Sequence, residues 1–265
     1  MSYKLVVVDL DGTLVLKNPE VSPKNKEEIR RIQNKSVIFS IASGRMFSSI
    51  LPYAEELDIK VPLICYGGAM LVDSVTKKVL YQVTVPLETA KLVIRVARAF
   101  DLHVNLHIGE NVYIEKERTE AEAYCKNARV KAIVVGDLLS FIKEEPTKLI
   151  VISENVSLLD EVGEIIRNQT NGKLNITKSF PTYLEVVNRE ASKGKALEMM
   201  AAILKIEPEE VMAVGDSFND IDMLEWAGLG IAMGNAPGEV KEAANYITAS
   251  FEEDGVALAL ERFIE

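Results

Sequence analysis

Short apolar runs alternate with amphipathic stretches towards both ends of this chain. The runs are typical of strands buried in a parallel sheet and cover residues 4–9, 37–41, 63–66, 211–214 and 229–233. Apolar residues at helical spacing predict helices over 24–34, 46–57, 193–205, 219–227 and 237–244, and another after Asp254. Strands that alternate with helices predict an α/β fold with a doubly wound parallel sheet.

The middle of the chain has a different pattern. Predicted strands at 79–85, 103–108, 111–115, 130–135, 149–152, 174–178 and 183–187 are mixed with predicted helices at 87–100, 119–128 and 156–169. Gly109, Glu110 and Asn111 form a hairpin signal between two of these strands. Hairpins mixed with helices predict a separate α+β domain at 84–184, inserted into an α/β domain that comprises 1–83 and 185–265.

The length and charge of the chain narrow its possible functions. Its 265 residues are enough for two domains. The net charge of −10 argues against nucleic acids and anionic membranes as partners, since both select basic patches. There is no apolar stretch of the roughly 20 residues that span a bilayer, and no secretory signal precedes the first strand. Because two cysteines are too few for a disulfide framework, we expect a cytoplasmic protein.

Two carboxylates follow the first predicted strand. Asp9 and Asp11 stand where this strand ends, and Gly12 lets the chain turn directly after them. Ligands of open α/β sheets bind beyond the carboxyl ends of the strands. One carboxylate could therefore act as a nucleophile and the other as a proton donor and acceptor. The alternative is a polar strand end that only begins a surface turn.

A second strand end carries a possible anion site. Ser43, Gly44 and Arg45 follow the strand at 37–41 and precede a helix, so that a hydroxyl and free backbone N–H groups would meet at the helix N-terminus. Arg45 could hold a phosphate with both arms of its guanidinium. Alternatively, Ser43 only caps the helix and Arg45 is a solvated helix residue.

The helix at 193–205 begins with two lysines. Lys193 and Lys195 are two residues apart, so only one of them can face a given site. Such a lysine would bring a positive charge to the edge of the sheet, whereas a surface lysine is the commonest kind. Periodicity leaves the choice between the two open.

A second acidic pair, Asp216 and Asp220, follows the strand at 211–214. Close to Asp9 and Asp11, this pair would form an oxygen-rich site that suits Mg²⁺, which binds one or two carboxylates, phosphate oxygens and waters. Helix capping by each aspartate would explain one such cluster but not two at matched strand ends.

These segments together resemble the phosphatase motifs of the haloacid dehalogenase-like hydrolase superfamily. In chain order the matching segments are Asp9-Leu10-Asp11-Gly12-Thr13, Ser43-Gly44-Arg45, Lys193-Gly194 and Gly215-Asp216-Ser217-Phe218-Asn219-Asp220. The inserted domain resembles the large α/β cap of the Cof-type (type IIB) subclass, and Ala232-Met233-Gly234-Asn235-Ala236 matches a stretch near the end of that subclass. One position departs from the pattern, because the subclass usually has Asn-Gly-Ala where this chain has Gly67-Gly68-Ala69.

The resemblance implies a Mg²⁺-dependent phosphatase with a Rossmann-like core that hydrolyses a small phosphate monoester, such as a sugar phosphate. It implies that Asp9 attacks phosphorus and forms an aspartyl-phosphate, and that Asp11 protonates the leaving group and then activates water. Ser43 and Lys193 would hold the phosphoryl oxygens. By the same resemblance, Mg²⁺ is held by Asp9, the Asp11 carbonyl, Asp216 and, directly or through water, Asp220; Asn219 contacts the phosphate or lies behind it, and Gly44 and Arg45 belong to the substrate-binding segment.

Two other functions share parts of this pattern. A phosphosugar mutase uses the same core and cap type but returns the phosphoryl group to a sugar instead of water. A receiver-like phospho-acceptor also combines Asp, Ser or Thr, and Lys on a parallel sheet, but its domain is about half this length and has no inserted cap. In the phosphatase, we expect the cap to exclude water and to select the leaving group.

One strand of the inserted domain has a polar face. His103, Asn105 and His107 alternate there with apolar residues. The two histidines are about 13 Å apart along a strand, too far to bind one metal ion. We expect a solvated strand face. The sharper hypothesis is that this face covers the site and recognises the hydroxyl groups of the substrate.

Overall fold

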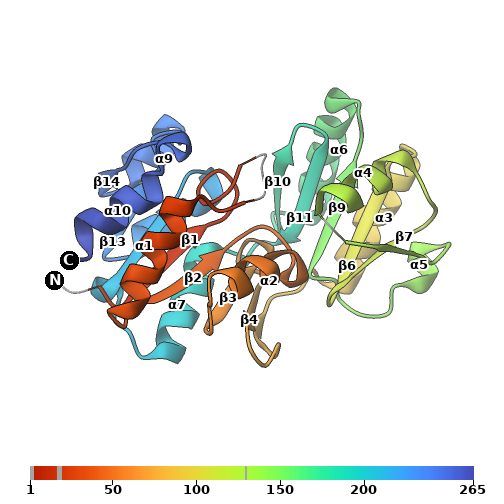
Figure 1. Ribbon diagram of the computed structural model, residues 1–265. Helices are drawn as coiled ribbons and strands as arrows, with labels where there is room; N and C mark the ends of the chain where they lie inside the picture. Colours follow the sequence, from red (N-terminus) through yellow and green to blue (C-terminus); the bar gives the residue numbers. More distant parts are fainter. Residues whose placement is uncertain (1–2, 17–19, 129) are drawn as a thin grey trace. The chain divides into compact units, whose positions relative to one another are not determined.

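The structure is a computed structural model that describes residues 3–16, 20–128 and 130–265. The chain forms two compact units (Figure 1). The core unit comprises Met1–Tyr81 and Ser192–Glu265, and the inserted unit comprises Gln82–Ala191. The boundary predicted at 84 lies close to the start of the inserted unit, whereas the boundary predicted at 184 falls within the strand Tyr183–Asn188, before the end of this unit. Each unit has its own sheet and its own hydrophobic core.

The core unit is built on an eight-stranded sheet with the order β14-β13-β12-β1-β2-β3-β4-β5. Its strands are β1 (Leu5–Asp9), β2 (Ile38–Ala42), β3 (Pro62–Cys65), β4 (Met70–Asp73), β5 (Val79–Gln82), β12 (Val211–Gly215), β13 (Leu229–Ala232) and β14 (Tyr246–Ile247). The strands from β14 to β3 pair in parallel. The predicted parallel sheet is therefore confirmed, but the sequence analysis missed β4, which pairs with β3 in the antiparallel sense and lies between β3 and β5.

Helices cover the strands of this sheet, as the alternating pattern predicts. They are α1 (Pro23–Asn34), α2 (Phe47–Glu56), α7 (Lys193–Leu204), α8 (Ile221–Trp226), α9 (Gly238–Ala243) and α10 (Gly255–Phe263), with short 3₁₀ turns at η1 (Tyr66–Gly68), η2 (Pro208–Glu210), η3 (Phe218–Asp220) and η4 (Phe251–Glu253). Leu5 and Val7 of β1 pack with apolar residues of α7 and α8. Val6 and Val8, which point to the other side of the sheet, are equally buried. Burial on both faces explains the continuous apolar run.

The strand order places the candidate residues at one edge of the sheet. The chain proceeds from β1 outward to β2 and β3, whereas β12 continues to β13 and β14 in the opposite direction. Ligands of open α/β sheets bind at such a reversal, beyond the carboxyl ends of the strands. Asp9 is the last residue of β1, and Asp216 directly follows β12. Two acidic segments more than 200 residues apart in the sequence thus meet at this edge.

The inserted unit contains a six-stranded mixed sheet with the order β10-β11-β9-β6-β7-β8. Its elements are α3 (Leu87–Ala99), β6 (His103–Ile108), β7 (Asn111–Ile114), α4 (Thr119–Ala128), β8 (Ala132–Val134), α5 (Leu138–Phe141), β9 (Lys148–Ile152), α6 (Val156–Thr170), β10 (Leu174–Phe180) and β11 (Tyr183–Asn188). Apolar residues of β6, β9 and β11 form a core with α3 and α6. Strands β6 and β7 form the predicted hairpin. Within the described parts of the chain, no helix has the length and hydropathy of a membrane-spanning segment.

The polar face of β6 is buried, so the prediction of a solvated face is wrong. His103, Asn105 and His107 are 5%, 0% and 1% exposed. His107 pairs across the sheet with Lys148, and its Nε2 lies 3.4 Å from the hydroxyl of Tyr124 on α4. His103 Nε2 lies 2.7 Å from Asn105 Oδ1. The strand pattern could not show that neighbouring strands and a helix cover this face.

Candidate active site

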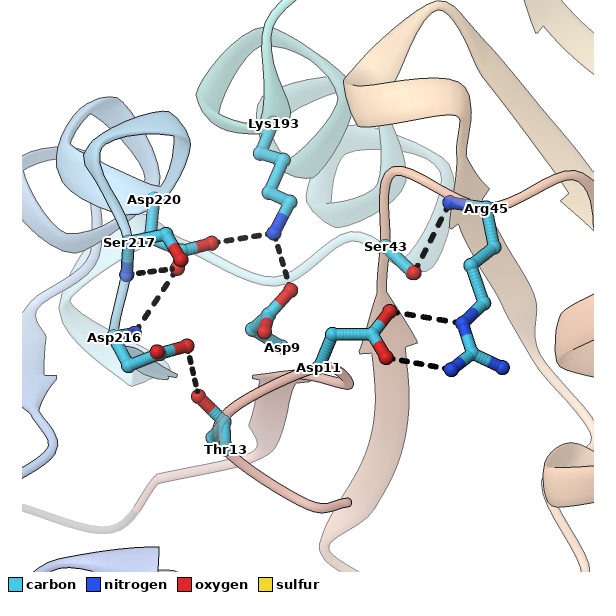
Figure 2. A network of polar contacts seen from close by, with 9 residues as sticks. All are labelled: Asp9, Asp11, Thr13, Ser43, Arg45, Lys193, Asp216, Ser217 and Asp220. Atoms are coloured by element: carbon cyan, nitrogen blue, oxygen red, sulfur yellow. Dashed lines mark hydrogen bonds and ion pairs between the residues drawn. The ribbon is translucent and has the colours of Figure 1, made fainter. Parts of the chain in front are cut away.

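The end of β1 presents Asp9 to the site through a tight turn. Asp9 is 4% exposed. At Gly12, where φ is +91°, a Cβ atom would lie 2.3 Å from Asp216 Oδ2. Only glycine therefore allows this turn to approach the second acidic segment. Thr13 Oγ1 donates a hydrogen bond of 3.0 Å to Asp216 Oδ1 and joins the two segments (Figure 2).

Lys193 projects from the first residue of α7 into the same site. Its Nζ lies 2.5 Å from Asp9 Oδ1 and 2.5 Å from Asp220 Oδ1 (Figure 2). Burial by itself would lower the pKa of Lys193, but the charges of Asp220 and Asp9 outweigh burial and raise the pKa above its ordinary value. The ammonium group therefore stays charged. Because Lys195 is exposed, the structure brings Lys193 rather than Lys195 to the carboxylates.

Asp220 organises the turn that follows β12. Its Oδ2 accepts hydrogen bonds from the backbone N–H groups of Asp216, at 3.0 Å, and Ser217, at 2.9 Å. Its Oδ1 accepts from Lys193. Both oxygens of Asp220 are thus engaged in holding the turn and the lysine. Asp216 also lies close to Asp9, with one oxygen of each within 4.8 Å of the other.

The charge balance of this cluster fits a divalent cation. Asp9, Asp216 and Asp220 each offer an oxygen, and these oxygens lie within 4.8 Å of one another. Lys193 can balance one of the three negative charges. Asp9 Oδ2 is buried and accepts no hydrogen bond from the described residues. Hard oxygen donors with two uncompensated charges are the donor set that Mg²⁺ prefers.

The pKa values of the same carboxylates support this interpretation. Burial raises the pKa of Asp9 well above its usual value; Lys193 opposes this effect, and Asp220 and Asp216 add to it. Burial and the charge of Asp220 raise the pKa of Asp216 to about 6. Carboxylates that resist ionisation without a metal are expected where a bound cation normally supplies the opposite charge.

The segment after β2 carries the buried Ser43 hydroxyl. The Ser43 N–H donates to Ile64 O at 2.9 Å and thereby extends the pairing of β2 with β3. Ser43 Oγ accepts a hydrogen bond of 3.1 Å from the N–H of Arg45. Helix α2 begins later, with Met46 in the N-cap position, so the interpretation of Ser43 as the cap of this helix is wrong. Gly44, between Ser43 and Arg45, has open space beside its Cα atom.

Arg45 binds Asp11 with both arms of its guanidinium. Its Nε lies 2.9 Å from Asp11 Oδ2, and its Nη2 lies 2.6 Å from Asp11 Oδ1 (Figure 2). The guanidinium also lies over the ring of Tyr53, with its Cζ atom 5.7 Å from the ring centroid. The Arg45 guanidinium, which the sequence suggested as a phosphate ligand, therefore binds the Asp11 carboxylate in this structure.

Two further sequence candidates lie at the margin of the site. Asn219 is exposed in η3, and among the described residues no hydrogen bond or ion pair involves its side chain. Gly67, where the subclass usually has Asn, has φ +64° and open space beside its Cα atom. Asn tolerates this backbone conformation. The position could therefore accommodate the amide that this chain lacks.

Three polar residues near the site had no role in the sequence analysis. Asp222 Oδ2 accepts hydrogen bonds from the Ser192 hydroxyl and from the N–H of Gly194, the latter at 3.0 Å. Ser192 has a readable signal, because a serine directly before a helix is typical of an N-cap. Asp222 has no such signal, since only the packing of α8 beside α7 brings it there. Asn235 belongs to a recognised segment, but its contacts depend on the fold.

Comparisons with known proteins relate this chain to one family. The sequence model of a haloacid dehalogenase-like hydrolase family matches residues 6–260. A 5-amino-6-(5-phospho-D-ribitylamino)uracil phosphatase of Bacillus subtilis is 33% identical, with 100% of this chain and 97% of that protein covered. A solved haloacid dehalogenase-like hydrolase from Bacteroides thetaiotaomicron is 32% identical with a TM-score of 0.91, and the match covers 98% of this chain and 99% of that one. A solved structure from Thermotoga maritima is 34% identical with a TM-score of 0.89 and coverage of 99% and 98%. The chain therefore belongs to the haloacid dehalogenase-like hydrolases, and it is a phosphatase of the Cof type.

Proposed function

We propose that this phosphatase hydrolyses a small cytoplasmic phosphate monoester, with Mg²⁺ as its cofactor and an aspartyl-phosphate as its intermediate. The observation that carries the proposal is the buried, unpaired oxygen of Asp9, which lies beside a charged lysine and a second carboxylate. A carboxylate oxygen that accepts no hydrogen bond is free to form a bond to phosphorus. The charges around it suit a transferring phosphoryl group and a metal ion.

We propose that three groups of the chain hold the metal ion. Asp9, the backbone carbonyl of Asp11 and Asp216 would hold Mg²⁺. Asp220 would act through a water molecule, because Lys193 and two backbone N–H groups already occupy its oxygens. The bound ion supplies positive charge to the phosphoryl oxygens as charge develops on them.

The residues of the chain then divide the reaction into two steps. Asp9 attacks phosphorus in line, an Asp9 O–P bond forms, and the bond from phosphorus to the ester oxygen breaks. Asp11 gives a proton to the departing alkoxide. In the second step Asp11 takes a proton from water, and the water oxygen attacks phosphorus. The Asp9 O–P bond breaks, so that inorganic phosphate departs and the Asp9 carboxylate is regenerated. Ser43 and Lys193 bind the phosphoryl oxygens in both steps.

The substrate is proposed to be a small phosphorylated metabolite. The Bacillus subtilis relative is named for a phosphoribityl compound, and the net charge of −10 disfavours nucleic acids. We further propose that the inserted unit selects the leaving group. Burial lowers the pKa of His107 to about 3, so His107 stays neutral at physiological pH. Because Asn105 and His107 are fully buried, neither side chain is available to a hydroxyl group of the substrate.

Turnover of p-nitrophenyl phosphate with Mg²⁺ tests the mechanism. Asp9→Asn is expected to lower kcat by at least about 10³-fold, because the amide cannot attack phosphorus. Asp58→Asn is the matched control at an exposed turn and should leave kcat unchanged. Acid quenching should trap a phosphoryl group on the peptide that contains Asp9. Activity that survives Asp9→Asn or excess EDTA would contradict the proposal.

The two rival functions predict different outcomes. A mutase would need a bisphosphate activator and would return the phosphoryl group to the sugar, so product analysis with and without that activator identifies it. A receiver-like protein would accept a phosphoryl group but would turn over none of the esters.

A further inference from the structure

The side-chain amide of Asn235 connects the two acidic segments of the site. Asn235 lies in the turn between β13 and α9, and its Nδ2 donates a hydrogen bond of 3.0 Å to Gly12 O. The same Nδ2 lies 3.4 Å from Asp216 Oδ2. On its other side, Asn235 Oδ1 accepts a hydrogen bond of 3.0 Å from the N–H of Phe251. One amide thus contacts the turn after β1, the turn after β12 and the segment before α10.

Backbone partners fix the orientation of this amide. The N–H of Phe251 can only donate and Gly12 O can only accept. Asn235 must therefore direct its oxygen to Phe251 and its NH₂ group to Gly12. In this orientation the NH₂ group, and not the oxygen, faces the Asp216 carboxylate.

The contacts of Asn235 bear on two of the proposed metal ligands, Asp216 and the backbone carbonyl of Asp11. An oxygen of Asp216 lies within 4.8 Å of oxygens of Asp9 and Asp220, so the negative charges of these carboxylates repel one another. Asp216 Oδ1 accepts a hydrogen bond from the Thr13 hydroxyl, and the NH₂ group of Asn235 is the donor near Asp216 Oδ2. Gly12 directly follows Asp11, whose backbone carbonyl is the third proposed ligand. An anchor on Gly12 O therefore also limits the movement of that carbonyl.

We propose that Asn235 is a positioning residue that holds Asp216 and the Asp11 carbonyl in the geometry that binds Mg²⁺. This inference rests on the proposed function, since that function supplies the metal. Residues that orient metal ligands typically change metal affinity by about 10–100-fold when they are replaced. Because Asn235 is exposed, its truncation to Ala removes these hydrogen bonds without opening a cavity in the core.

Calorimetric titration of the full-length protein with MgCl₂, without substrate, tests the inference. The variant is Asn235→Ala, and the matched control is Lys241→Met. Lys241 Nζ donates to Gly234 O at 2.7 Å and thus anchors the same turn without contacting Asp216. We expect the Kd for Mg²⁺ to rise about tenfold in Asn235→Ala and to stay unchanged in Lys241→Met. In a phosphatase assay, a saturating Mg²⁺ concentration should restore kcat in Asn235→Ala.

Each other outcome overturns the inference in a recognisable way. If Asn235→Ala binds Mg²⁺ as tightly as the wild type, Asn235 positions nothing at the metal. If both variants weaken binding equally, the effect comes from the integrity of the turn. If the wild type itself binds no Mg²⁺, the proposed function fails together with the inference, and this result differs from the first two.

Discussion

At the scale of single residues, two carboxylates close in the sequence differ in their exposure to solvent. Asp9 is 4% exposed and faces Lys193. The side chain of Asp11 is 49% exposed and faces Arg45. A nucleophile benefits from a dry site with fixed charges, whereas a group that exchanges protons with a leaving alcohol and with water must reach both. The surroundings of the two residues therefore match the roles proposed for them.

Arg45→Ala tests whether Arg45 acts on Asp11 or on phosphate. We expect kcat for an alkyl phosphate to fall by about tenfold or more, as part of the 10²–10⁴-fold that a general acid contributes. With p-nitrophenyl phosphate kcat should change little, because nitrophenolate leaves without a proton. The inhibition constant of inorganic phosphate should also stay constant. The melting temperature should hardly move, since partly exposed ion pairs contribute about 0–1 kcal/mol.

Arg45→Lys is the conservative control, because it keeps the charge and loses the two-armed contact. An equal loss with both substrates, or weaker inhibition by phosphate, would instead assign Arg45 to phosphate binding.

At the scale of elements, the start of α7 is attached to α8. Ser192 caps α7 by accepting the N–H of Lys195 at 3.1 Å, and it donates its hydroxyl proton to Asp222. Asp222 also accepts the N–H of Gly194, where a Cβ atom would lie only 2.7 Å from Asp222 O. The helix that carries Lys193 is thereby joined to the segment that carries Asp216 and Asp220. A carboxylate at a helix N-terminus also interacts favourably with the helix dipole.

Removal of this attachment should affect both stability and phosphate binding. Ser192→Ala is expected to reduce the free energy of unfolding by about 1 kcal/mol, as the loss of an N-cap usually does. It should also raise the inhibition constant of phosphate several-fold, because Lys193 loses its alignment. Asn155 is the N-cap of α6, and its Oδ1 accepts a hydrogen bond of 3.1 Å from the N–H of Leu158. Asn155→Ala removes this cap. It should cost similar stability without a change in phosphate inhibition. Unchanged inhibition in Ser192→Ala would show that the cap serves stability alone.

The elements also show what can be predicted from the sequence. Strands such as β1 and β12 are predictable because burial on both faces requires continuous apolar runs. Their parallel pairing follows from the alternation with helices, and it brings Asp9 and Asp216 to one edge. The antiparallel strand β4 was missed because the tight turn directly after β3 reverses the chain without an intervening α-helix, which departs from the alternation of strands and helices.

Side-chain contacts were less predictable than the elements. Lys193 and Lys195 have the same type and neighbouring positions, and only the packing of α7 decides which one is buried. The partner of Arg45 and the burial of His107 likewise depend on segments that are distant in the sequence. Local patterns record propensity and periodicity, and they contain no information about such contacts.

At the scale of the whole molecule, the inserted unit buries a basic group, whereas the core unit buries acidic groups. The inserted unit buries His107, whose pKa falls to about 3 because burial disfavours the charged imidazolium. The core unit buries Asp9 and leaves Asp216 partly buried, and loss of solvent raises the pKa of both, that of Asp216 to about 6. Each unit has its own core. Their stabilities should therefore respond to pH separately.

Without Mg²⁺, acidification from pH 7 to pH 5 should weaken the inserted unit and strengthen the core unit. Between pH 6.5 and 3 the unfolded state binds a proton at His107 that the folded state does not bind. The stability of the inserted unit therefore decreases as the pH is lowered, by about 2 kcal/mol at pH 5. For Asp216 the folded state takes up its proton first, so its contribution is full below about pH 4 and is lost as pH rises through about 6.

Hydrogen exchange in EDTA, corrected for intrinsic rates, measures both units in one experiment. Protection should decrease in β6 and β9 and increase in β1 and β12 when the pH is lowered from 7 to 5. His107→Gln should abolish most of the change in the inserted unit and leave the core unit as it is. Excess Mg²⁺ should remove the gain in the core unit, because the bound ion favours the ionised carboxylates. A parallel loss of protection in both units would show that they unfold as one cooperative body and that the buried charges do not act separately.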